Sequence, residues 1–190
     1  MSRPYHHGHL AETLLQAAEI ELAAVGPGAL SLRAVARRAG TTHAAIYHHY
    51  ADRGALLAAL AARGFGALDA ALGEAIAAAG KDPREQLMAA GLAYLAFARA
   101  HPQTVALLFE ERGFPRDAAV REAGARAFGH LLGVVERVRP GPGALADALV
   151  CWSAMHGLAA LGRGGGLDWT GLDAAQQAQI LTERVARLVG

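Results

Sequence analysis

The side chains of this sequence that are best suited to bind another molecule lie in residues 31–53, SLRAVARRAGTTHAAIYHHYADR. This segment holds four arginines against one acidic residue, Asp52, although the whole chain carries a formal net charge of only +1. Arginine donates paired hydrogen bonds to phosphate groups, and small or hydroxyl-bearing side chains can approach base edges closely. The segment therefore favours nucleic-acid binding over catalysis.

Two short helices joined by a tight turn would position these side chains. The apolar positions of the first helix have a helical spacing: Leu32, Val35, Ala36 and Ala39. Gly40 then ends that helix, Thr42 can cap a second helix, and Ile46 faces the core. Asp52 can cap the next helix, which places Arg53 in its first turn. Such a pair forms the helix-turn-helix unit, whose second helix enters a DNA major groove; a plain helical hairpin inside an all-α bundle is the alternative.

The same residues resemble the N-terminal domain of the tetracycline-repressor-type (TetR) family of bacterial transcriptional regulators. The resemblance rests on residues 26–40, GPGALSLRAVARRAG, and on residues 44–60, AAIYHHYADRGALLAAL. It implies a ligand-responsive DNA-binding regulator that is not an enzyme, more often a repressor, bound to a near-palindromic double-stranded DNA operator. By position, the resemblance assigns Thr42, His43, Ala44 and Ala45 to the bases, Ser31, Tyr47, His49 and Arg53 to the phosphates, and Arg33 to either.

Composition predicts a soluble, cytoplasmic protein with a sizeable core. The chain is 53% hydrophobic and 18% charged, which argues against disorder. Its one cysteine, Cys151, excludes an intrachain disulfide and fits a reducing compartment. The first residues, MSRPYHHGHL, lack the apolar segment of a signal peptide, and charges or glycines interrupt the apolar runs that a membrane span would need. We therefore expect no membrane contact.

Helical periodicity runs along the whole chain without a strand pattern, so we expect an all-α fold of about nine helices. The N-terminal three-helix helix-turn-helix domain should comprise residues 1–53, and a larger helical domain for effector binding and dimerisation should comprise residues 54–190. A long helix from Asp52 to Gly80 would link the two. Gly64 and Gly66 interrupt this helix, either to allow close packing against another helix or to form a compliant joint.

The spacing Trp152-x-x-x-His156-Gly157 places the Trp and His side chains on one face of a helix. This resembles the C-terminal domain of a TetR subgroup named for its Trp-His-Gly residues. His156 would contact a ligand or bond a core partner, and aromatic or Met positions on helical stripes are usually core. A subset of them lining a cavity would form a pocket for a small apolar or amphipathic effector. The candidate residues are Phe65, Met88, Leu92, Leu95, Phe109, Phe128, Trp152, Met155 and His156.

The last two helices, expected over residues 144–161 and 172–189, carry more apolar surface than one partner helix covers. Their small residues permit close approach, so we expect a two-fold, four-helix interface between two copies of the chain. A bundle formed entirely within one chain is the alternative.

Catalytic and metal sites are not expected. Glu110 and Glu111 are adjacent and so do not share a helix face, and the sequence has no HExxH motif, nucleophile elbow or phosphate loop. The alternatives to a regulator are an α-helical enzyme or carrier and a structural interaction module. His6, His7 and His9 suggest a metal, but stable zinc binding normally draws on four ligands in a fixed geometry. We therefore predict no metal and no cofactor, and expect this arm to contact DNA instead.

Overall fold

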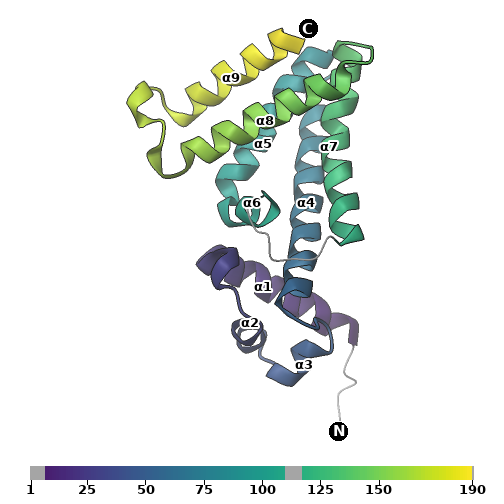
Figure 1. Ribbon diagram of the computed structural model, residues 1–190, viewed down its shortest axis with the longest axis vertical. Coiled ribbons are helices and arrows are strands. Elements are labelled where there is room, and N and C mark those ends of the chain that lie inside the picture. The colour runs from purple at the N-terminus through teal and green to yellow at the C-terminus, as the bar shows by residue number, and fades with distance from the viewer. Residues whose placement is uncertain (1–6, 110–116, 190) are drawn as a thin grey trace. The chain divides into compact units, whose positions relative to one another are not determined.

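The structure is a computed structural model that describes residues 7–109 and 117–189 (Figure 1). Within these ranges the chain forms α-helices and two short 3-10 turns and no strand, so the predicted all-α class is confirmed. The helices are α1 (His7–Ala29), α2 (Leu32–Arg38), α3 (His43–Tyr47), α4 (Arg53–Ala78), α5 (Pro83–Ala100), α6 (Pro102–Phe109), α7 (Ala118–Val138), α8 (Ala144–Gly162) and α9 (Ala174–Val189).

The helices divide into two compact units. The first comprises Met1–Phe65 with His101–Glu122, and the second comprises Gly66–Ala100 with Ala123–Gly190. By packing, the first unit thus takes in the start of α4 and all of α6 as well as the helix-turn-helix. The functional boundary expected after residue 53 stays a prediction.

Helix α1 provides the core of the first unit. Leu14, Ala18 and Leu22 recur every four residues and are almost fully buried, as the spacing predicts. Helix α1 packs against α2 and α6. Its regular part ends at Gly26, whose φ of 75° is open to glycine but strained for other residues. A Cβ atom there would also lie 2.8 Å from Gln103 Oε1 on α6.

The α2–α3 segment has the predicted caps and turn. The Ser31 hydroxyl accepts a hydrogen bond from the Ala34 amide at 3.2 Å, and the Thr42 hydroxyl accepts one from the Ala45 amide at 3.1 Å. Gly40 adopts a φ of 67° and ends α2 in the left-handed region. The segment is therefore a helix-turn-helix built by local hydrogen bonds.

Close packing explains Gly64, one of the two glycines expected to interrupt α4. A Cβ atom at Gly64 would lie 2.7 Å from Thr104 Cγ2 on α6, so only glycine permits this approach. No described atom outside the local backbone lies within 4 Å of a Cβ atom built at Gly66. Close packing therefore accounts for Gly64. For Gly66, the compliant joint stays a prediction.

Helix α5 lies at the centre of the second unit and packs against α8 and α9, which also pack against each other (Figure 1). Leu87, Tyr94 and Phe97 of α5 are buried. His130 on α7 contacts the Asp69 carboxylate on α4 at 3.0 Å. Helices α5, α8 and α9 supply walls of the cavities described below.

Two helices, α4 and α8, are long and apolar enough to cross a membrane by length and composition alone. Half of the apolar window of α4 is buried inside the protein, as in the core helix of a soluble protein. Only 22% of the corresponding window of α8 is buried. The apolar surface of α8 thus stays largely uncovered in a single chain.

Candidate nucleic-acid interface and effector cavity

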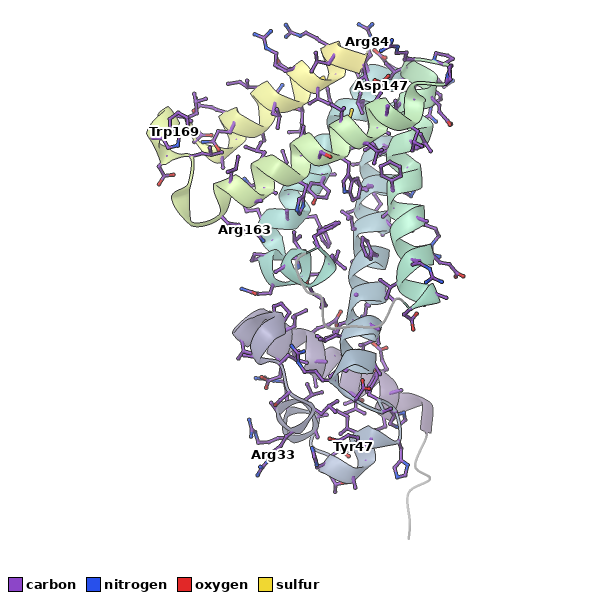
Figure 2. The ribbon with its side chains drawn as sticks, viewed as in Figure 1. Arg33, Tyr47, Arg84, Asp147, Arg163 and Trp169 are labelled. Atoms are coloured by element: carbon purple, nitrogen blue, oxygen red, sulfur yellow. The ribbon has the colours of Figure 1, made fainter. Side chains whose placement is uncertain are left out.

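Helix α3 has one buried side chain, which anchors it, and an exposed face. Ile46 is fully buried and anchors the helix. The exposed residues at this helix are Thr42, His43, Ala44, Tyr47 and His48. The rings of His43 and Tyr47 pack edge to face with centroids 5.0 Å apart. Figure 2 shows Tyr47 on α3 and the Arg33 side chain extending from α2 into solvent.

This face carries four of the nine residues that were predicted to contact DNA, Thr42, His43, Ala44 and Tyr47. Thr42, His43 and Ala44 follow one another at the exposed start of α3, while Ala45 and His49 are less prominent, Ala45 being half-buried. Ser31 is exposed, although its hydroxyl also caps α2. The geometry suits base and phosphate contacts, and the individual contacts stay predictions.

Arg53 has an intramolecular role that the sequence did not predict. Its Nε donates to the carbonyl oxygen of Leu30 at 3.1 Å, and its terminal Nη2 donates to the carbonyl oxygens of Pro27 and of Gly28, the latter at 3.4 Å. The guanidinium therefore ties the start of α4 to the α1–α2 connection. No local spacing could reveal this tie, because more than twenty residues separate donor and acceptors. The phosphate contact proposed for Arg53 stays a prediction.

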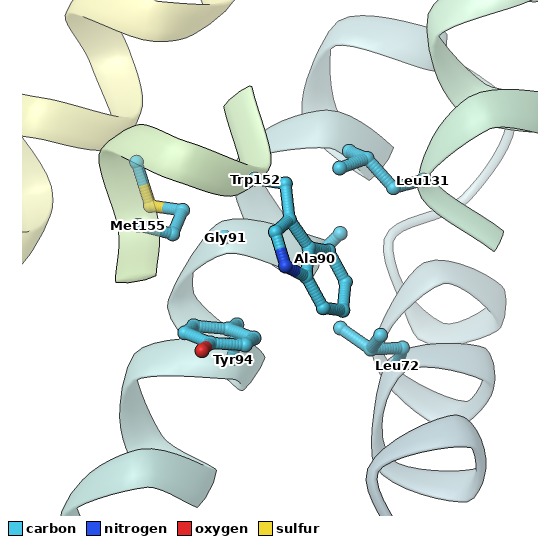
Figure 3. A pocket seen from close by; sticks show the side chains of 7 residues that line it. All are labelled: Leu72, Ala90, Gly91, Tyr94, Leu131, Trp152 and Met155. Atoms are coloured by element: carbon cyan, nitrogen blue, oxygen red, sulfur yellow. The ribbon is translucent and has the colours of Figure 1, made fainter. Parts of the chain in front are cut away.

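Two small cavities lie next to each other inside the second unit, and each has a volume of about 20 Å³. The first is lined by Leu72, Ala90, Gly91, Tyr94, Leu131, Trp152 and Met155 (Figure 3). The second is lined by Leu87, Gly91, Leu131, Cys151, Met155, Thr182 and Val185. A space of this size holds about one water molecule. The site is therefore small and mostly apolar.

A hydrogen bond between Tyr94 and His156 borders the first cavity. The Tyr94 hydroxyl lies 2.8 Å from His156 Nδ1. Burial raises the pKa of the Tyr94 phenol, which keeps it neutral and able to donate this bond. The Trp152 ring packs against Tyr94 with centroids 5.3 Å apart and against Phe128 at 5.6 Å. Of the two alternatives for His156, the structure thus provides the core partner.

Four of the nine predicted effector residues gather here: Trp152 and Met155 line the cavities, Phe128 supports Trp152, and His156 holds Tyr94. Phe65 and Phe109 belong instead to the first unit, where their rings pack edge to face at 5.8 Å.

Met88, Leu92 and Leu95 are not among the residues that line either cavity, and Leu92 is 36% exposed. Sequence reasoning missed Gly91 and Tyr94 as lining residues, although both fall on the predicted apolar stripe of α5. Their contacts with a ligand, and those of the nine candidates, stay predictions.

Several sequence predictions concern residues that the structure does not describe. His6, Glu110 and Glu111 lie outside the described residues, and nothing is described of the His7 and His9 side chains. The N-terminal arm therefore stays a prediction. Across residues 7–109 and 117–189, no three His, Cys, Asp or Glu side chains form a group that could hold a metal ion.

Comparison with protein families identifies the fold. A family described as "Tetracyclin repressor-like, C-terminal domain" matches residues 87–185, and one described as "Bacterial regulatory proteins, tetR family" matches residues 14–60. The chain belongs to the TetR family. Trp152, His156 and Gly157 lie inside the first match, and the subgroup named for them stays a prediction.

Solved structures agree with membership in the TetR family. A protein with unknown function from Rhodococcus sp. RHA1 is 38% identical over 98% of each chain, with a TM-score of 0.85. A bacterial regulatory protein in the tetR family from Rhodococcus RHA1 is 20% identical over 95% of this chain and 94% of its own, with a TM-score of 0.66. The TetR-family transcriptional regulator PfmR from Thermus thermophilus shares the fold at 18% identity, 92% and 97% coverage and a TM-score of 0.69. No curated protein matches.

TetR-family proteins are DNA-binding regulators that are not enzymes; they bind operators as dimers and respond to small molecules. The predicted DNA-binding regulator is therefore confirmed, and the enzyme alternative is set aside on the basis of the family.

Proposed function

We propose that this TetR-family protein is a homodimeric cytoplasmic repressor that a small apolar or amphipathic effector releases from its operator. The observation that carries the proposal is the exposed face of α3, which presents His43, Ala44 and Tyr47 while Ile46 is buried and anchors the helix. This face belongs to a helix-turn-helix of the family, and within the described part of the first unit these three side chains stay open to solvent.

The α3 face suits the DNA major groove. Ala44 is small enough to allow close approach to base edges, and Thr42 and His43 offer hydrogen-bonding groups beside it. Ser31, Tyr47, His49 and Arg53 are proposed for the phosphates, and Arg33 for bases or phosphates. Phosphate contacts set the register of the helix on the duplex, while base contacts read the sequence.

Exposed apolar side chains on α8 and α9 support dimerisation through these two helices. Leu145, Leu149 and Val150 on α8 are 51 to 54% exposed, and Ile180 and Leu188 on α9 are 47% and 72% exposed. A group of exposed large apolar side chains on two neighbouring helices supports an association site. A two-fold axis would pair the patch with itself and build a four-helix interface.

A two-fold dimer dictates the form of the operator. Two recognition helices related by a two-fold axis read half-sites about 34 Å apart, which makes the operator near-palindromic. Effector binding in the second unit lowers operator affinity only if the effector prefers the state that binds DNA less well. The cavities beside Trp152 and Met155 are the proposed place for it.

The test is gel retardation and footprinting on the DNA upstream of the protein's own gene. We expect one protected near-palindrome, whose affinity falls steeply with added salt. Ala44→Glu, which places a negative charge on the α3 face, should abolish retardation. Ala96→Glu makes the same change at an exposed position of α5 and should retain it. Equal effects of the two variants would contradict the proposed face.

A panel of apolar and amphipathic small molecules, added to the retarded complex, tests release. Loss of retardation on addition of one of them supports the repressor, whereas retardation that requires a ligand would indicate the opposite polarity.

A further inference from the structure

The two cavities of the second unit share three lining residues, Gly91, Leu131 and Met155, and each has a volume of about 20 Å³. A benzene-sized ligand needs a cavity of about 150 Å³. As the side chains lie in this structure, neither cavity admits a molecule with an aromatic ring.

Glycine at position 91 makes room for the Met155 side chain. A Cβ atom at Gly91 would lie 3.2 Å from Met155 Sδ and 2.7 Å from Thr182 Cγ2. The Met155 thioether therefore lies against the bare backbone of α5 (Figure 3). Met is unbranched and flexible, and it fills irregular gaps without a fixed shape. A change of its rotamer would join the cavities and add the volume that the side chain leaves.

The cavity walls carry no charged side chain, and both of their hydroxyl groups are already hydrogen-bonded. The Thr182 hydroxyl shares its one proton between two carbonyl oxygens of its own helix, at 2.8 and 3.0 Å. The Tyr94 hydroxyl is bonded to His156, and burial keeps the Cys151 thiol neutral by raising its pKa to about 11. Among the described residues, every buried side-chain nitrogen or oxygen has a hydrogen-bond partner. A charged ligand would lose its hydration here without compensation.

We infer that Met155 is a movable partition within one apolar site, and that this site takes an uncharged, apolar molecule of about one aromatic ring. The inference rests on the proposed ligand-responsive function and names the chemical class of the effector. Trp152 and Tyr94, whose ring centroids are 5.3 Å apart, supply aromatic walls for such a molecule.

Toluene and benzoate are matched probes, because they share a ring and differ by a methyl group against a carboxylate. Each is titrated into the full-length, DNA-free protein, and binding is followed by thermal unfolding and by NMR of 13C-methyl-labelled methionines. We expect toluene to raise the melting temperature and to shift the Met155 methyl signal, while benzoate does neither. Met88, which lines neither cavity, is the internal control.

Three outcomes would overturn the inference. The first is a failure of toluene to bind, and the second is benzoate binding as tight as that of toluene. The third is toluene binding in which only the Met88 signal moves. That result would place the ligand away from Met155.

Two substitutions test the partition itself. Met155→Leu conserves volume but stiffens the side chain, so toluene affinity should fall. Met155→Ala removes the partition; if the open state is populated to about 10% in the native protein, toluene affinity should rise about tenfold. Should the alanine variant fail to fold, judged by near-UV circular dichroism, the leucine variant still decides. Unchanged toluene affinity in Met155→Leu contradicts the partition.

Gel retardation, measured separately, distinguishes this inference from the proposed function. A protein that retards operator DNA but does not bind toluene refutes the inference and leaves the regulator intact. Toluene binding with the Met155 shift, in a protein that retards no DNA, refutes the proposed regulator and supports the site.

Discussion

Replacing Arg53 by alanine is expected to destabilise the first unit, in addition to any loss of DNA affinity. The half-buried guanidinium donates to the carbonyl oxygens of Pro27, Gly28 and Leu30. A hydrogen bond that involves a charged group contributes about 1.5 to 3 kcal/mol. Because the group is partly exposed and one contact is long, we expect a total loss of about 2 kcal/mol. In a chain of this size that lowers the melting temperature by about 4 to 8 °C.

Urea unfolding and the salt dependence of operator binding separate the two roles of Arg53. Loss of one phosphate contact lowers the slope of log affinity against log salt by about 0.9 per subunit. Arg53→Lys keeps the charge but not the planar fork, so it should retain most of the salt slope while losing most of the stability. Arg37→Ala, at an exposed position of α2, is the control and should unfold like the native protein. An unchanged urea midpoint in Arg53→Ala would refute the tie.

Three further predictions concern the second unit. Leu149→Glu should split the dimer into monomers with weak operator affinity, because the charge would be buried in the α8–α9 interface; a dimer by sedimentation would contradict this interface. Gly91→Ala should lower the free energy of unfolding by about 1 to 3 kcal/mol, since the new Cβ would lie 2.7 Å from Thr182 Cγ2. A higher urea midpoint in this variant would show that α5 and α9 can move apart without cost. Burial raises the pKa of the Cys151 thiol from 9.0 to about 11, so the stability that the buried neutral thiol contributes is complete below about pH 9 and is lost as the pH rises through 11. In urea titrations at several pH values, Cys151→Ala should therefore reduce the fall in the free energy of unfolding over this range. A fall as large as in the native protein would assign it to other groups.

Local signals in the sequence predicted the helices of the described chain well. The caps at Thr42 and Asp52 and the left-handed turn at Gly40 depend on residues within four positions of one another, and all three are observed. Helix α1 starts at His7 and takes in a further turn after the kink at Gly26. Hydrogen bonds over short separations depend on residue type and spacing, which a sequence displays directly.

The residues that line the cavities could not be predicted in the same way. Periodicity shows that Phe65, Phe109 and Trp152 each lie on an apolar stripe, but not which stripes meet. In the structure the Phe109 ring of α6 packs against the Phe65 ring of α4 in the first unit. Arg53 likewise donates hydrogen bonds to backbone carbonyl groups far away in the sequence, and no pattern of side chains predicts which carbonyl group will accept them. These are tertiary contacts, set by how helices pack.

The shortness of α3 has a consequence for how such a regulator changes its target. Five residues cannot hold a helix in water, so α3 takes its shape from the Thr42 cap and from Ile46 in the core. His43 and Ala44 are exposed and contribute little to that support. Substitutions at these two positions therefore alter stability by only about 0.5 kcal/mol or less. A lineage carrying this fold can acquire a new DNA target through one or two exchanges, without first acquiring a sturdier scaffold.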